Sequence, residues 1–236
     1  MTGTIVFDFD GTLALGRGPI VAYARSLAAS ADDEGFFARA HAAIDDFESG
    51  ASTYRDGYHA VGALASASGI DPAALAAAYG ASREALGTTD AAVHAPDGLA
   101  PFLERLSGRA RLLLATNAPG TGIARVLDTW GVAPFFTATH FTVGKPEGLT
   151  KIIREALATG PVLSVGDIVD FDLVPAMQLG ADTALVGVTA MISDAPVDLR
   201  GRTVADLYAD IESWAAAASS STPVPLGTPL PTERQS

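Results

Sequence analysis

The chain has 236 residues and a formal net charge of −12, and 48% of it is hydrophobic and 18% charged. That length corresponds to one or two domains, with enough apolar material for a sizeable core. The acidic excess argues against a nucleic-acid-binding surface, because such surfaces depend on clustered Lys and Arg. The lack of cysteine excludes disulfides, thiolate metal sites and thiol nucleophiles.

The start of the chain does not resemble a targeting segment, because Asp8 and Asp10 interrupt its first apolar run. No stretch of the sequence is apolar enough over sufficient length to predict a membrane span. We therefore expect a soluble, cytoplasmic protein with neither nucleic-acid nor membrane partners. The sequence gives no prediction of the oligomeric state.

The first part of the chain combines one strand with a long helical segment. Residues 4–9 are β-branched or aromatic and end in Asp-Gly-Thr, which predicts a strand followed by a turn. Between residues 17 and 92, alanine dominates and larger apolar side chains recur at helical spacing. Asp71 followed by Pro72 is a typical helix start. Residues 17–92 are therefore predicted to form an inserted all-helical domain.

The second part of the chain alternates between helices and strands. The expected helices cover 99–106, 121–130, 149–158, 173–179 and 204–214, and the expected strands cover 111–115, 135–139, 162–165 and 183–186. Apolar strands separated by helices predict an α/β fold, with a parallel sheet covered by helices on both faces. The predicted core thus comprises residues 1–16 and 93–218, and the Ser- and Pro-rich residues 219–236 predict a disordered tail.

Polar side chains follow the ends of several predicted strands. Asp8 and Asp10 close the first strand, Thr116 and Asn117 close the second strand of the core, and Asp167 follows a later one. Because the carboxyl ends of parallel strands form one rim where ligands bind, we expect these residues to converge on a single site.

Such a site would concentrate negative charge. The carboxylates of Asp8, Asp10, Asp167 and Asp172 would repel one another unless a cation lies between them. Oxygen ligands without His or Cys beside them suit Mg²⁺. Lys145, one of only two lysines in the chain, would add a fixed positive charge. An aspartate nucleophile with a metal, a lysine and a hydroxyl around it is suited to phosphoryl transfer.

These residues also form a pattern that resembles the haloacid dehalogenase (HAD) superfamily. The resemblance covers roughly residues 4 to 215, and residues 17–92 resemble the cap inserted in phosphoglycolate-phosphatase-like members. It implies a Rossmann-like core beneath an all-α cap. The four motifs occur in family order as Asp8-Phe-Asp10-Gly-Thr-Leu, Leu-Leu-Ala-Thr116-Asn117, Lys145-Pro and Gly-Asp167 followed by Asp172.

The resemblance assigns a catalytic role to each motif. Asp8 would attack phosphorus and form an aspartyl-phosphate, and Asp10 would protonate the leaving alcohol and then activate water. Thr116, with Asn117 beside it, would bind the phosphoryl group. Lys145 would orient Asp8 and neutralise charge.

The resemblance also implies a set of magnesium ligands. Mg²⁺ would be held by the carboxylate of Asp8, the backbone carbonyl of Asp10 and the carboxylate of Asp167. Asp172 matches the second acidic position of the last motif and would act directly or through water. Asp170 falls outside the family's spacing, so no role is assigned to it.

The function implied by this pattern is a Mg²⁺-dependent phosphatase that acts on a small phosphorylated metabolite. A phosphomutase shares all four motifs and stays open as an alternative. A haloacid dehalogenase is disfavoured because dehalogenases of this family have no acid at the position that Asp10 occupies in this chain. A receiver-like signalling domain and a non-catalytic phosphate-binding protein are further alternatives.

In the cap, four residues are candidates for substrate contact: Tyr54, Arg55, Tyr58 and His59. A partly exposed helix face also accounts for them.

Overall fold

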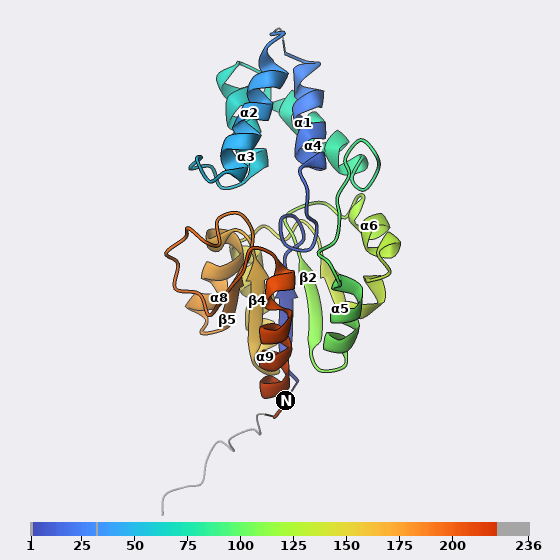
Figure 1. The fold of residues 1–236 in the computed structure, drawn as a ribbon, viewed down its shortest axis with the longest axis vertical. Coiled ribbons are helices and arrows are strands. Elements are labelled where there is room, and N and C mark those ends of the chain that lie inside the picture. Colours follow the sequence, from blue (N-terminus) through green and yellow to red (C-terminus); the bar gives the residue numbers. More distant parts are fainter. Residues whose placement is uncertain (1, 32, 221–236) are drawn as a thin grey trace, which may run out of the picture.

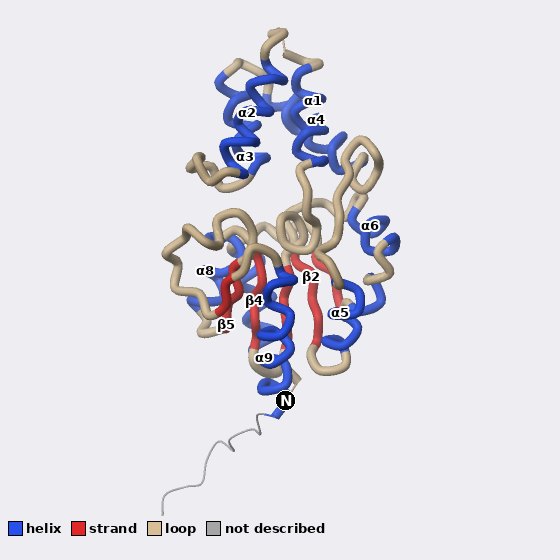
Figure 2. Tube along the Cα trace, in the orientation of Figure 1, coloured by secondary structure: helices blue, strands red, loops and turns tan. Residues whose placement is uncertain are grey.

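The protein consists of a parallel sheet flanked by helices and a separate group of four helices above it (Figures 1 and 2). Its structure is a computed structural model that describes residues 2–31 and 33–220. The sheet order is β3-β2-β1-β4-β5-β6, and all neighbouring strands are parallel. The first strand of the chain therefore lies inside the sheet. The strands are β1 (Thr4–Phe7), β2 (Arg111–Ala115), β3 (Ala138–His140), β4 (Val162–Gly166), β5 (Asp182–Leu185) and β6 (Leu199–Arg200).

Helices cover both faces of the sheet, as the sequence predicts. Ile5 and Phe7 face one apolar cluster with α5 (Leu99–Ser107), α6 (Ile123–Thr129) and α9 (Tyr208–Ser220). Val6, between them, faces the opposite cluster, which contains residues of α7 (Glu147–Leu157) and α8 (Val174–Gln178). Successive side chains of a strand point to opposite faces, so β1 contributes to both layers of the core.

The four helices above the sheet are α1 (Gly18–Ala28), α2 (Phe36–Glu48), α3 (Gly57–Ala67) and α4 (Pro72–Glu84). They pack around their own apolar cluster, whose largest members include Tyr23, Phe36 and Ile44. The predicted start of α4 is confirmed: the Asp71 carboxylate accepts a hydrogen bond from the Ala73 N–H at 2.7 Å. These helices all follow β1, at the position where the sequence predicts a helical insertion.

The expected strand over 135–139 is wrong in its first half. Residues Ala133–Phe135 form a 3₁₀ turn, η1, and β3 begins only at Ala138. Pro134 has no N–H to donate to a neighbouring strand, and the Phe135 N–H bonds instead to the Val132 carbonyl at 3.1 Å. The aromatic pair that suggested a strand therefore belongs to a turn that packs on the core.

Three further features are absent from the sequence-based prediction. A π-helical turn, η2 (Val169–Leu173), precedes α8, and a 3₁₀ turn, η3 (Val204–Leu207), precedes α9. The edge strand β6 is only two residues long, too short to show a pattern. The expectation of a disordered tail from 219 is wrong for residues 219 and 220, which belong to α9, and residues 221–236 lie outside the described part of the chain. Among the helices described, none has the length and hydropathy needed to cross a membrane.

Candidate active site

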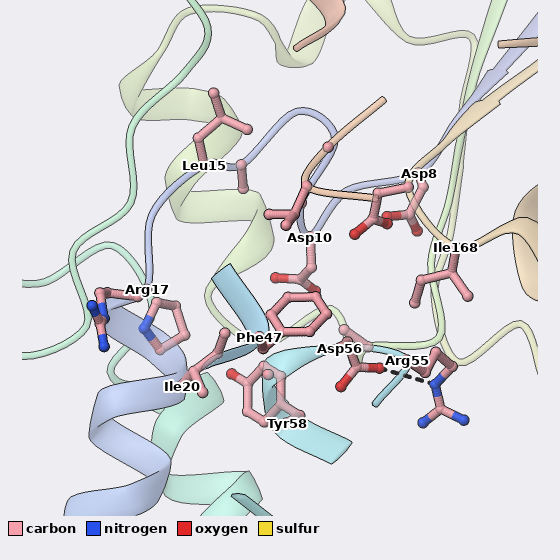
Figure 3. A pocket seen from close by; sticks show the side chains of 18 of the residues that line it. Asp8, Asp10, Leu15, Arg17, Ile20, Phe47, Arg55, Asp56, Tyr58 and Ile168 are labelled. Carbon is pink, nitrogen blue, oxygen red and sulfur yellow. Dashed lines mark hydrogen bonds and ion pairs between the residues drawn. The ribbon is translucent and has the colours of Figure 1, made fainter. Parts of the chain in front are cut away.

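The polar residues at the ends of β1, β2 and β4 line a single cavity of about 440 Å³. The cavity is lined by residues from this end of the sheet and from the helical group (Figure 3). The structure thus brings together every residue that the sequence predicts for the site. They are Asp8, Asp10, Thr116, Asn117, Lys145, Asp167 and Asp172.

A buried lysine connects two of the carboxylates. The Lys145 ammonium donates to Asp8 Oδ1 at 2.6 Å and to Asp172 Oδ1 at 2.7 Å, and its side chain is only 3% exposed. The loop that carries it is held by Asn117, whose Oδ1 accepts a hydrogen bond from the Lys145 N–H at 2.7 Å. The contact we observe for Asn117 is therefore with the backbone of the lysine loop.

Three carboxylates form a compact acidic cluster. Oxygen atoms of Asp8, Asp167 and Asp172 all lie within 4.8 Å of one another. The pKa of Asp8 is raised to about 7, chiefly by burial and also by the charge of Asp172, although Lys145 acts to lower it. Burial and then the charge of Asp8 also raise the pKa of Asp167 well above its usual value. When all three carboxyls are ionised, the cluster carries more negative charge than one lysine can neutralise.

One oxygen of this cluster is left without a partner. Asp167 Oδ1 is buried and has no hydrogen-bond partner among the described residues. A buried carboxylate oxygen without a partner is costly, so an additional positive group would be favourable at this position. The cluster therefore has the oxygen donors and the charge imbalance that suit a divalent cation.

Two glycines allow the carboxylates to come this close. Gly11 has φ +80°, and a Cβ there would lie 2.2 Å from Asp167 Oδ2. A Cβ at Gly166 would lie 2.3 Å from Asp172 Cβ. Side chains at these positions would displace the carboxylates, which explains why glycine follows Asp10 and precedes Asp167.

Asp10 lies apart from the acidic cluster. Its Oδ1 accepts a hydrogen bond from Arg83 Nη1 at 2.9 Å, and the Arg83 side chain is only 1% exposed. Sequence reasoning missed Arg83 because the two residues are 73 positions apart and nothing in the spacing of α4 marks its inward face. The Thr116 hydroxyl, also in the cavity, is buried and accepts a hydrogen bond from the Ala118 N–H at 3.1 Å.

The far side of the cavity comes mainly from the helical group and combines apolar side chains with the charged Glu48, Arg55 and Asp56. Ile20, Phe47 and Tyr58 lie opposite Asp8 and Asp10 in Figure 3, and Phe171 of the core completes the lining. Arg55 lies over the Phe171 ring at 4.6 Å from its centroid, so the helical group touches the core there.

The remaining candidates divide between the cavity and the surface. Besides these candidates, Arg17 lines the cavity, and its guanidinium is paired with Asp45 at 2.6 Å. Tyr54 and His59 stack edge-to-face and do not line it, and Asp170 is exposed outside it.

Comparison with known protein families gives one assignment. Residues 2–180 match the model of a hydrolase family, described as haloacid dehalogenase-like hydrolase. The chain belongs to this family. The resemblance carried by its motifs is thereby confirmed, and the protein is a hydrolase of the HAD type with the expected α/β fold. No curated protein matches the chain.

Solved structures support the same fold. A predicted phosphatase from Clostridium acetobutylicum is 16% identical, covers 90% of this chain and 99% of its own, and has a TM-score of 0.63. YfnB from Bacillus subtilis, solved bound to magnesium, is 18% identical, with coverages of 89% and 98% and a TM-score of 0.59. A HAD phosphatase from Thermococcus onnurineus is 19% identical, with coverages of 89% and 97% and a TM-score of 0.54. At identities of 16–19%, the similarity to these structures shows a shared fold alone.

Proposed function

We propose that this HAD-type hydrolase is a Mg²⁺-dependent phosphatase that cleaves a small phosphorylated metabolite through an aspartyl-phosphate. The observation that carries the proposal is the bridge from Lys145 to Asp8 and Asp172, with Asp167 beside them, on the wall of the cavity. An anionic substrate could approach these carboxylates only if added positive charge offsets them.

The metal site would be formed by the acidic cluster. Asp8, Asp167 and Asp172 would hold Mg²⁺ together with the backbone carbonyl of Asp10, as the family resemblance implies. The unpartnered Asp167 Oδ1 supports this assignment, since a cation would satisfy it. When bound, the ion supplies positive charge beside the carboxylates and the phosphoryl oxygens.

The first chemical step would be carried out by Asp8. One carboxylate oxygen attacks phosphorus, the bond from phosphorus to the ester oxygen breaks, and an acyl phosphate forms on Asp8. Lys145 holds the Asp8 carboxylate in place and offsets negative charge as this bond forms. Thr116, whose hydroxyl lies in the same cavity, would donate a hydrogen bond to a phosphoryl oxygen.

Asp10 would move the protons in both steps. It gives a proton to the leaving ester oxygen, so that an alcohol departs. In the second step a water molecule attacks phosphorus and passes a proton back to Asp10. The bond between phosphorus and Asp8 then breaks, which releases inorganic phosphate and restores both residues.

The helical group would serve as a cap that selects the substrate. We propose residues 17–92 as this cap and residues 1–16 and 93–218 as the catalytic core. A cavity of about 440 Å³ is within the usual range for small-molecule sites. Its Ile20, Phe47, Tyr58 and Phe171 lining favours a leaving group with apolar surface.

The test is a phosphatase assay with Mg²⁺, first on p-nitrophenyl phosphate and then on a panel of phosphorylated metabolites. Activity should disappear with EDTA, and Asp8→Asn should reduce kcat at least about a thousandfold while the far-UV circular dichroism stays unchanged. Asp170→Asn is the matched control, because Asp170 is exposed outside the cavity, and it should retain full activity. EDTA-insensitive hydrolysis, or substantial turnover by Asp8→Asn, would exclude the mechanism.

A further inference from the structure

The ion pair between Asp10 and Arg83 joins the catalytic core to the helical group. Arg83 is in the last turn of α4, and its Nη1 lies 2.9 Å from Asp10 Oδ1. The Arg83 side chain is almost fully buried, whereas that of Asp10 is 35% exposed toward the cavity. The arginine therefore approaches Asp10 from the protein side and leaves the cavity side of Asp10 open.

Arg83 is held at this position from the core. Arg125 of α6 donates to the backbone carbonyls of Glu84 and Leu86, at 2.9 and 2.6 Å. Gly122, just before α6, lies so close to this segment that a Cβ there would come within 2.6 Å of the Arg83 carbonyl oxygen. The end of α4 is thus fixed against α6, which fixes the origin of the Arg83 side chain.

Asp10 is the acidic partner of Arg83, and Tyr58 and Tyr79 also lie close enough to interact with its guanidinium. Nε and Nη2 of Arg83 are buried and have no hydrogen-bond partner among the described residues. A guanidinium does not lose its proton in proteins, so its charge must be balanced where it is buried. Asp10 is the acidic side chain in contact with it, so separating the pair would leave the buried guanidinium without its ion-pair partner.

We propose that Arg83 is a positioning residue, which holds Asp10 with one carboxylate oxygen fixed and the other directed to the ester oxygen of the substrate. This inference rests on the proposed function of Asp10. Oδ1 is bound to Arg83, whereas Oδ2 has no hydrogen-bond partner within the described part of the chain and is left free to contact the substrate.

The test uses two aryl esters that differ in how much the leaving group needs a proton. Nitrophenolate departs from p-nitrophenyl phosphate without protonation, whereas phenolate, a stronger base, departs from phenyl phosphate with much less ease. The quantity to compare is kcat/KM, because it reports the steps up to cleavage of the ester bond and excludes hydrolysis of the aspartyl-phosphate.

Arg83→Met should lower kcat/KM for phenyl phosphate by about a hundredfold and for p-nitrophenyl phosphate by less than about tenfold. Arg83→Lys should lose less kcat/KM for phenyl phosphate than Arg83→Met, since lysine keeps the positive charge but lacks the planar guanidinium that fixes the hydrogen-bond geometry. In an Asp10→Asn background, Arg83→Met should add no further loss. Arg105→Met, which removes an exposed ion pair with Glu212, is the control and should change neither ester.

Equal losses on both esters would overturn the inference, because a general disturbance of the site would not depend on the leaving group. If Arg83→Met does not fold, Arg125→Met loosens α4 from α6 and should give the same selective loss at smaller size. Failure of the wild-type protein to hydrolyse either ester with Mg²⁺ would instead refute the proposed function. The two failures are therefore distinguishable.

Discussion

Replacing Lys145 by methionine should strongly destabilise the metal-free protein. The ammonium lies 2.6 Å from Asp8 and 2.7 Å from Asp172, and methionine keeps the apolar stem while removing this charge. Removing one partner of a buried ion pair costs about 3–5 kcal/mol, because the remaining charge is uncompensated. Since domains are stable by only about 5–15 kcal/mol, this is a large share of the free energy of unfolding.

The loss should depend on pH in a defined direction. The pKa of Asp8 is raised to about 7, chiefly by burial, even though Lys145 acts to lower it, so removal of Lys145 raises the pKa of Asp8 further. Between the usual pKa of an aspartate and the raised pKa of Asp8 in the folded protein, the unfolded chain binds fewer protons at Asp8 than the folded one. The free energy of unfolding therefore falls as the pH rises through this interval. Lys145→Met should therefore be less destabilising at about pH 5.5, where Asp8 is protonated, than at about pH 8.5.

Urea denaturation in EDTA, followed by tryptophan fluorescence, measures the effect. The two tryptophans, Trp130 and Trp214, both pack against the main core cluster, so the signal reports the unfolding of the core. With a slope of about 2 kcal/mol per molar urea, the expected loss shifts the midpoint by about 2 M. Lys151→Met, at the only other lysine, exposed on α7, should leave the midpoint unchanged. A Lys145→Met midpoint equal to that of the wild type at about pH 8.5 would refute the electrostatic argument.

Two further predictions concern the acidic cluster. Because the pKa values of Asp8 and Asp167 are raised, protons compete with Mg²⁺ for these carboxylates. Calorimetry should show the Mg²⁺ affinity falling at least about tenfold per pH unit below about pH 7. An affinity that does not change with pH would contradict this prediction. Gly11→Ala places a Cβ 2.2 Å from Asp167 Oδ2 and should abolish Mg²⁺ binding. Gly131→Ala, also at positive φ but with no atom within 4 Å of its Cβ, should cost only about 1–2 kcal/mol of stability and keep that binding.

The layered fold and the meeting of the acidic residues follow from simple patterns in the sequence. Continuous apolar strands separated by helices predict a parallel sheet, and polar residues at the strand ends are then placed on one rim. Asp8 and Asp167 meet for this reason although they are far apart in the chain. Lys145 follows the short edge strand β3, so the sequence could predict a positive charge near this rim. Its two contacts, with Asp8 and with Asp172, are visible only in the three-dimensional structure.

The contacts between the helical group and the core could not be predicted in this way. Helical periodicity indicates which face of α4 is apolar, but Arg83 lies at its end, where an arginine is ordinarily exposed. Its burial against Asp10 depends on how the whole helical group sits above the sheet, which no local pattern encodes. The start of β3 was missed for a different reason, because the hydrophobic pattern of the Phe135 region fits a strand and a packed turn equally well.

The site concentrates features that lower the stability of the ligand-free fold. Asp167 holds a buried oxygen without a partner, the Asp8 carboxylate is buried beside two others, and Arg83 has two buried nitrogens without partners among the described residues. A protein selected for stability alone would replace such groups by apolar ones, often at no cost. Their presence at one end of the sheet, in the wall of one cavity or directly behind it, implies that bound ligands repay this cost. Cation binding should therefore raise the free energy of unfolding with concentration, as linkage requires of any ligand that binds only the folded state.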